Sequence, residues 1–137
     1  MAYWLLKTEP TTYSFADLER ERVTAWTGVR NPQAQENLRA MKAGDRVLIY
    51  HSGTKVAVGV AEVARTAYPD PTAADGQRAC VDVRAVSALS APVPLGVLKQ
   101  APSFAGSPLL RQGRLSVVPL SHEQWRAAMT LGRAPTT

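Results

Sequence analysis

The side chains that most often carry catalysis are scarce in this chain of 137 residues. His51 and His122 are its two histidines, Cys80 is its one cysteine, and none of the three stands at a metal-ligand spacing. The sequence contains no glycine-rich phosphate loop, no nucleophile elbow and no HExxH motif. A cysteine hydrolase needs a histidine partner, and nothing pairs Cys80 with His51. We therefore expect a binding protein without metal or cofactor, and a buried, inert Cys80.

Polar and aromatic side chains gather where predicted strands and helices begin or end, which is where sites are commonly built. These candidates are Lys7 and Glu9 after the first strand, Trp26, Arg30 and Asn31 before a helix, Tyr50, His51 and Ser52 at a strand end, and Arg111 and Arg114 near the last strand. Trp26 is followed by a polar loop, so a binding wall and a core side chain fit it equally well. His51 fits a hydrogen-bonded structural role as well as a ligand contact. Trp4 and Trp125 lie in apolar periodic segments and are predicted to be core.

The charge of the chain is basic and consists mostly of arginine. Sixteen Lys and Arg against eleven Asp and Glu give a net charge of +5 and a pI near 9.8, above the value of about 9 that is typical of nucleic-acid-binding domains. Twelve of the sixteen basic residues are Arg, whose planar fork suits phosphates and base edges. GC-rich coding also enriches arginine, so the composition is compatible with nucleic-acid binding and does not establish it.

Two helices in the N-terminal half have recognisable start signals. Ser14 with Asp17 three residues later resembles a capping box and predicts a short helix. Asn31 followed by Pro32 predicts a helix over residues 32–43. The start of this second helix is a candidate phosphate site, because free N–H groups and the helix dipole favour an anion there.

Strands alternate with these helices. Apolar runs predict strands over residues 3–6, 46–50, 56–63, 80–86 and 115–118, a turn of helix at 95–99 and a last helix over 121–129. In the strand at 56–63 the valines are expected to face the core, and Gly59 indicates a bulge or the close approach of a backbone or ligand. The prolines between residues 92 and 108 predict irregular structure around the short helical turn. The pattern predicts one α+β domain built on a curved mixed sheet or small barrel.

Targeting signals are also missing from the sequence. No apolar run approaches the roughly 20 residues that span a bilayer, so no membrane partner is expected. The N-terminus lacks a basic leader, a long apolar stretch and a cleavage site, so we expect a cytoplasmic protein.

Six short segments stand in a compact order along the chain. They are Tyr3-Trp4-Leu5-Leu6-Lys7-Thr8-Glu9-Pro10, Tyr13-Ser14 with Asp17-Leu18, Trp26-Thr27-Gly28-Val29-Arg30-Asn31, Met41-Lys42-Ala43-Gly44-Asp45, Tyr50-His51-Ser52, and Arg114-Leu115-Ser116-Val117. Together they resemble the blocks of the EVE domain family, and the resemblance covers about residues 2–129. Pro32 departs from this pattern and removes one backbone N–H.

The resemblance implies a PUA-like fold, in which a curved mixed sheet closes into a pseudo-barrel with short helices at its edges, over a single domain of residues 1–137. It also implies recognition of a modified base, such as methylated or hydroxymethylated cytosine in DNA, as in the related YTH readers of methylated adenine. By position, the resemblance makes Trp26 a wall of an aromatic pocket and Tyr68 a second candidate wall. It implies that the entrance or floor of the pocket is formed by Lys7, Thr8 and Glu9, and that polar contacts come from Tyr50, His51 and Ser52. It implies contacts to the nucleic-acid backbone from Arg30, Asn31, Arg111 and Arg114. Two alternatives stay open: a general RNA-binding module, and an enzyme that acts on a small nucleotide-like ligand.

Overall fold

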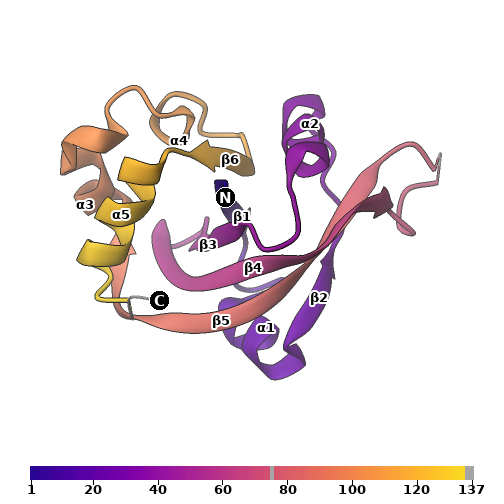
Figure 1. The fold of residues 1–137 in the computed structure, drawn as a ribbon, viewed down its shortest axis with the longest axis horizontal. Coiled ribbons are helices and arrows are strands. Elements are labelled where there is room, and N and C mark those ends of the chain that lie inside the picture. Colours follow the sequence, from indigo (N-terminus) through magenta and orange to yellow (C-terminus); the bar gives the residue numbers. More distant parts are fainter. Residues whose placement is uncertain (75, 135–137) are drawn as a thin grey trace.

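A six-stranded curved sheet forms the centre of the molecule. The computed structural model describes residues 1–74 and 76–134 of the chain. The strands are β1 (Tyr3–Thr8), β2 (Val23–Trp26), β3 (Arg46–His51), β4 (Val56–Pro69), β5 (Ala79–Pro94) and β6 (Val117–Leu120). The helices are α1 (Phe15–Glu21), α2 (Pro32–Ala40), α3 (Leu95–Gln100), α4 (Pro108–Arg111) and α5 (His122–Leu131), with a 3-10 turn, η1, at Pro102–Phe104. In Figure 1, α1 and α2 lie on opposite sides of the long β4–β5 ribbon, and α3, α4 and α5 gather beyond one end of it.

The strand order is β2-β5-β4-β3-β1-β6. β1 and β3 pair in parallel, whereas the other neighbours are antiparallel. Register shifts interrupt the β4–β5 ladder at several points, and such bulges bend and twist a sheet. The α+β class and the curved mixed sheet are as predicted. The predicted closure into a pseudo-barrel is not found, since β2 and β6 are the two edges of the sheet and do not pair within the described residues.

Three helices begin at the capping residues that the sequence contains. Ser14 with Asp17 and Ser121 with Gln124 both form complete capping boxes, and these begin α1 and α5. Asn31 caps α2 through a bond from the Ala34 N–H.

The predicted helix over 32–43 is three residues too long at its C-terminal end. Met41 is already extended, and the Lys42 N–H donates to Asp45 Oδ2 at 2.9 Å. This turn carries the chain directly into β3, so the helix ends at Ala40.

The strand predictions were correct in place and wrong in extent. β2 and α4 were not predicted, β4 and β5 are far longer than expected, and the last strand begins at Val117 rather than at residue 115. Pro92 and Pro94 belong to β5 instead of an irregular segment. A proline is tolerated there because the β4–β5 register is interrupted between Ala88 and Val93, and β2 pairs with an earlier part of β5.

The two faces of β4 were assigned the wrong way round at its start. Ala57 and Gly59 are buried, whereas Val56 and Val58 are half-buried. The reason is the ring of Phe15, which would come within 2.4 Å of a Cβ placed on Gly59. The close approach predicted at Gly59 is therefore made by a core side chain of α1, next to a register shift of the strand.

One cluster of buried apolar side chains joins the sheet to the helices. Its fully buried members include Leu5, Leu18, Leu48 and Phe104, each of which stabilises the fold by about 1.5–3 kcal/mol relative to an exposed side chain. Trp4 and Trp125 belong to this core, as predicted, and Cys80 is a buried free thiol. Among the described helices, none has the length and apolar character that a membrane crossing requires.

Candidate functional site

Strands β1 and β3 are parallel neighbours inside the sheet, and their C-terminal ends lie side by side. Six of the predicted residues lie at these two strand ends. Lys7 is opposite Tyr50 and Thr8 is opposite His51 in the register. The N–H of Ser52 donates to Thr8 O at 2.9 Å, and Glu9 follows directly after β1. We refer to these residues as the strand-end cluster: Lys7, Thr8, Glu9, Tyr50, His51 and Ser52.

Lys7 is the cation of this cluster. Its Nζ donates to the carbonyl of Gly113 at 3.0 Å and lies 5.9 Å from the centre of the Tyr50 ring. Burial lowers the pKa of Lys7 and raises the pKa of Tyr50. Within the described residues no carboxylate forms an ion pair with Lys7. A half-buried ammonium that lacks a protein counter-ion favours a ligand that is anionic or rich in acceptors.

Thr8 and His51 hold the chain that follows β1. Thr8 Oγ1 donates to the carbonyl of Tyr13 at 2.7 Å, and His51 Nε2 accepts from the Phe15 N–H at 3.0 Å. Burial lowers the pKa of His51, although the charge of Glu9 opposes this shift. A neutral His51 that accepts at Nε2 carries its proton on Nδ1. The structural role considered for His51 is therefore present, and Nδ1 is the polar atom left for a ligand.

Glu9 lies close to the turn that follows β3. A Cβ built on Gly53 would be 2.6 Å from Glu9 Oε2, so the absence of a side chain at Gly53 makes room for the carboxylate. Glu9 Oε1 also accepts from Thr11, through Oγ1 at 3.3 Å and through the N–H at 3.4 Å. The bonds from Thr11 hold the Glu9 carboxylate within the strand-end cluster.

Trp26 ends β2 and has an aromatic partner that the sequence did not single out. The rings of Trp26 and Tyr13 meet edge to face, with centroids 6.0 Å apart and planes at 86°. Tyr13 OH donates to Glu21 at 2.6 Å, and burial together with this bond raises the pKa of Tyr13 to about 12. Because the carbonyl of Tyr13 accepts from Thr8, Tyr13 links Trp26 to the strand-end cluster. Trp26 is 8% exposed, so a ligand ring would meet one margin of the indole.

The loop after Trp26 is tied to the β4–β5 loop by a buried carboxylate that the sequence analysis missed. Asp70, 2% exposed, accepts from the Gly28 N–H at 2.8 Å and from the N–H and hydroxyl of Thr72, both at 2.7 Å. Burial opposes the ionisation of Asp70, but these bonds outweigh it and hold its pKa below the usual range. Gly28 has a φ of 80°, a conformation that a side chain would disfavour. The proximity of Asp70 to Gly28 has no local signal, since the two residues are 42 apart in the sequence.

A polar cavity of about 270 Å³ lies between these two loops. We call it the loop cavity, and it is lined by Gly28, Arg30, Asp70, Thr72, Ala73 and Arg78. Arg30, which was predicted to contact the nucleic-acid backbone, thus lines this cavity from the loop after Trp26.

The start of α2 offers fewer free donors than predicted. Asn31 Oδ1 accepts from the Ala34 N–H at 3.0 Å, and Pro32 has no N–H. The Ala34 N–H is therefore not free for an anion, and the basic side chains of the loop cavity are the stronger anion feature nearby.

Arg111 and Arg114 are exposed near Gly113, the partner of Lys7. Among the described residues, the ring of Trp26 meets that of Tyr13 and not that of Tyr68. Its hydroxyl donates to Asp82 at 2.5 Å, which raises the pKa of Tyr68, and the guanidinium of Arg65 lies 3.7 Å from its ring centre. The role of Tyr68 as a second wall stays a prediction.

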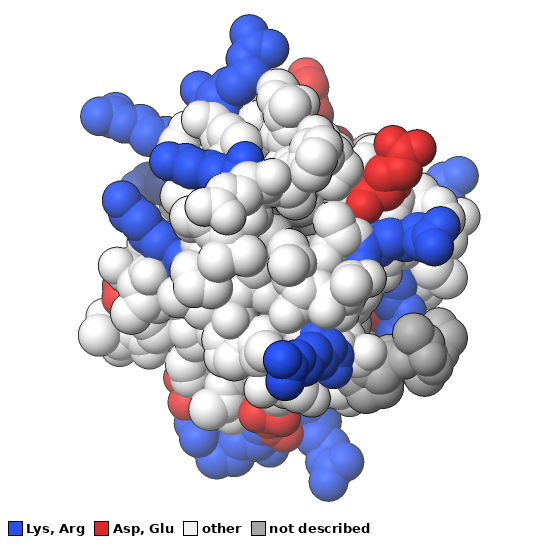
Figure 2. Space-filling model, turned by 90° about the vertical axis from the view of Figure 1, so that its left-hand side faces the viewer, with Lys and Arg blue, Asp and Glu red and all other residues white. Residues whose placement is uncertain are grey.

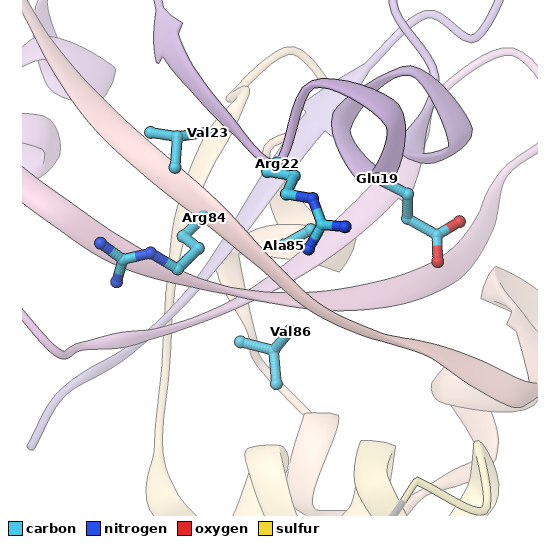
Figure 3. Close-up of a pocket in the computed structure, with 6 residues that line it drawn as sticks. All are labelled: Glu19, Arg22, Val23, Arg84, Ala85 and Val86. Carbon is cyan, nitrogen blue, oxygen red and sulfur yellow. The ribbon is translucent and has the colours of Figure 1, made fainter.

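A larger cavity, of about 430 Å³, lies at the C-terminal end of α1 (Figure 3). It is lined by Glu19, Arg22, Val23, Arg84, Ala85 and Val86, and it contains none of the predicted site residues. Arg84 is already paired with Glu62 at 2.9 Å. Figure 2 shows the side of the molecule that is on the left in Figure 1. On this face the basic side chains lie mostly around the rim, and the centre is largely uncharged. Neither surface contains residues of the strand-end cluster among those that define it.

Known proteins are similar to this chain in sequence and in fold. The sequence matches the EVE domain family over residues 2–131. Human thymocyte nuclear protein 1 is 32% identical, over 95% of this chain and 73% of that protein. The solved structure of Rpa0253 from Rhodopseudomonas palustris is 41% identical, with a TM-score of 0.92 over 100% of this chain and 97% of that one.

Two further structures hold nucleic acid. Human THYN1 in complex with DNA that contains 5-methylcytosine is 30% identical, with a TM-score of 0.84 over 99% of this chain and 100% of that one. The YTH domain of Zygosaccharomyces rouxii MRB1, solved with N6-methyladenosine RNA, is 17% identical, with a TM-score of 0.62 over 99% of this chain and 89% of that one, and it shares the fold. The resemblance found in the six sequence blocks is confirmed, and the chain belongs to the EVE domain family.

Proposed function

We propose that this protein binds nucleic acid and recognises a modified base, with methylated or hydroxymethylated cytosine in DNA as the first candidates. The observation that carries this proposal is the likeness, over nearly the whole chain, to the human protein solved with 5-methylcytosine DNA. The role proposed for the chain is binding rather than catalysis. The finer expectation of a closed pseudo-barrel is not part of the proposal, because the edge strands β2 and β6 do not pair within the described residues.

The strand-end cluster and the Trp26–Tyr13 pair together supply what a base pocket needs. A base that leaves its stack costs a few kcal/mol in a duplex and less in a single strand, and stacking on an aromatic side chain returns about 1–3 kcal/mol. These two quantities nearly cancel. Contacts of Lys and Arg with phosphates must then supply the net affinity, so the binding should weaken steeply as salt is added.

Recognition of the modification requires more than burial of one methyl group. A buried methyl contributes about 0.8 kcal/mol, or roughly fourfold in affinity. Hydrogen bonds to the base edge discriminate more strongly, because a wrong base leaves buried polar groups unpaired. Glu9 fits the exocyclic amino group of cytosine, which carboxylates accept from, and Lys7 or His51 Nδ1 fits an acceptor on the base.

A quantitative binding assay tests this function. Fluorescence anisotropy of labelled oligonucleotides would compare cytosine, 5-methylcytosine and 5-hydroxymethylcytosine in otherwise identical single and double strands, with an RNA of the same sequence. The variants are Trp26→Phe and Trp26→Ala, and the control is Trp125→Phe in the core. Thermal unfolding of each variant shows whether it is folded.

Tighter binding of a modified DNA, lost in Trp26→Ala and kept in Trp125→Phe, is the expected result. The label is on the oligonucleotide, so the loss of a tryptophan does not itself remove the signal. Preference for unmodified RNA would replace this proposal with the general RNA-binding module. Absence of binding to every oligonucleotide at low salt would overturn it.

A further inference from the structure

We propose that the loop cavity is a phosphate site, which binds the backbone of the same nucleic-acid strand whose base is held at Trp26. This inference rests on the proposed function and adds a second contact to it. Its new residues are Arg78, as a direct phosphate ligand, and Asp70, as the residue that positions the site.

The loop cavity lies within one nucleotide's reach of the base position. Gly28 lines the cavity and is two residues after Trp26, and two residues of chain span at most about 7 Å. A nucleic-acid strand carries a phosphate on each side of every base. The distance is therefore short enough for a base at Trp26 to place a neighbouring phosphate at the loop cavity.

The charge of the cavity suits an anion. Arg30 and Arg78 line it from the two loops, against the single acid Asp70, so the lining side chains carry a net charge of +1 (two Arg minus one Asp). Within the described residues, neither arginine forms an ion pair with a carboxylate at salt-bridge distance; Asp75 lies outside those residues. Arginine's planar fork binds two oxygens of a phosphate at once.

Asp70 would repel a phosphate if its charge were unshared, but three donors share it. The N–H of Gly28 and the N–H and hydroxyl of Thr72 all bond to its carboxylate, and the charge of Arg78 contributes to its lowered pKa. These bonds fasten the loop that bears Arg30 to the loop that bears Arg78. The buried acid thus holds the two arginines on either side of the cavity, which lowers the entropy cost of ordering them around a ligand.

The cavity at the end of α1 (Figure 3) also has two arginines and one acid in its lining, but that acid, Glu19, is exposed and does not tie two loops together as the buried Asp70 does. Arg84 there is paired with Glu62, and the exposed side chains of Val23 and Val86 form part of its lining. The two cavities therefore differ in chemistry, and the loop cavity is the one that fits a phosphodiester.

The test combines a protein variant with a chemically altered strand. Arg78→Ala is titrated with the best-bound oligonucleotide of the assay above, and with a series in which each phosphate in turn is an uncharged methylphosphonate. Arg126→Ala, which removes an exposed charge from α5 outside the cavity, is the matched control. Arg78→Lys keeps the charge and removes the fork.

We expect Arg78→Ala to bind about tenfold more weakly, as for the loss of one charge-assisted hydrogen bond. The loss should be equal for modified and unmodified strands, and the slope of log affinity against log salt should become shallower by about 0.7–0.9. One methylphosphonate next to the bound base should weaken wild-type binding by at least a similar factor and have a smaller effect in Arg78→Ala, where Arg30 is the arginine that remains in the cavity. Arg78→Lys should fall between the two proteins.

Three results would overturn the inference. If Arg78→Ala matches Arg126→Ala while Trp26→Ala has lost binding, the proposed function stands and the phosphate site does not. The same holds if the effects of Arg78→Ala and of every methylphosphonate are additive. If the wild-type protein binds no oligonucleotide, the function and the phosphate site are both overturned.

Discussion

The two ends of strand β1 carry nearly the same kinds of side chain and use them differently. At its start, Tyr3 stacks on Trp125 and on His122, with ring centres 5.0 Å and 5.7 Å apart, and Trp4 donates to Asp45 at 3.0 Å. We call these five residues the strand-start cluster. At the other end, the strand-end cluster joins Lys7, Glu9 and His51 to the pair Trp26 and Tyr13.

The difference lies in the partners of the polar atoms. In the strand-start cluster the buried carboxylate of Asp45 accepts from the N–H groups of Ala2, Trp4 and Lys42. In the strand-end cluster the ammonium of Lys7 has a carbonyl partner and no acid within the described residues. Residue type alone therefore does not distinguish the two clusters, whereas the partners of their charged groups do.

The largest expected effects on stability come from breaking the strand-start cluster, at Asp45 and at Trp125. Asp45→Ala leaves the Trp4 and Lys42 donors without their acceptor, which should lower the free energy of unfolding by about 3 kcal/mol. Urea denaturation measures this loss. Oligonucleotide affinity should be unchanged under conditions where the variant is folded; a parallel loss of affinity would show that the two ends of β1 are not independent.

The next effect addresses the strand-end cluster. Trp26→Ala should weaken binding of the preferred oligonucleotide by about thirtyfold, since stacking of one base contributes about 1–3 kcal/mol. Trp26→Ala and Trp125→Ala should each cost about 3–5 kcal/mol in stability, because both side chains are 8% exposed and belong to the core; Trp125→Ala is therefore the stability control. It should leave the affinity of the folded fraction as it was. Anisotropy titration with a parallel thermal melt distinguishes the two outcomes, and equal loss of affinity in both variants would contradict the assignment of roles.

A pH titration sharpens the comparison at His51. Its pKa is lowered from 6.5 in the folded protein, first by burial, so the folded state prefers the neutral ring. This contribution to stability is complete above the unfolded pKa and is lost as the pH falls below about 6.5 and through the folded value. We expect wild-type stability to decrease by about 1 kcal/mol between pH 7 and pH 5, and the decrease to be smaller in His51→Gln, whose amide oxygen can still accept from Phe15. Urea melts at several pH values measure both, and an equal decrease in the two proteins would show that His51 does not hold the start of α1.

What could be predicted from the sequence follows the range of each interaction. The starts of α1 and α5 were placed correctly because a capping box closes within four residues of chain. The polar residues at the ends of β1 and β3 were predicted as site candidates from the sequence. That these two strand ends lie side by side could not be predicted, because it depends on the pairing of the strands in the sheet.

The missed residues depend on distant partners. Asp70 bonds to Gly28 across 42 residues, and His51 bonds to Phe15 across 36. Tyr13 was within a recognised block, yet its contact with Trp26 required the unpredicted strand β2. The long β4–β5 ribbon was underestimated for the same reason, since a strand that contains Pro92 and Pro94 is stable only where its partner and its bulges accommodate them.

The smallest expected effect concerns the exposed arginines beside the strand-end cluster. Arg114 follows Gly113, whose carbonyl holds Lys7, and its exposed side chain would meet a phosphate in water rather than in a cavity. Arg114→Ala should therefore weaken binding by about two- to threefold at low salt, with a shallower salt slope. Arg133→Ala, which removes an exposed charge after α5, is the matched control. A loss as large as that of Trp26→Ala would instead place Arg114 at the base, and no difference from Arg133→Ala would remove it from the interface.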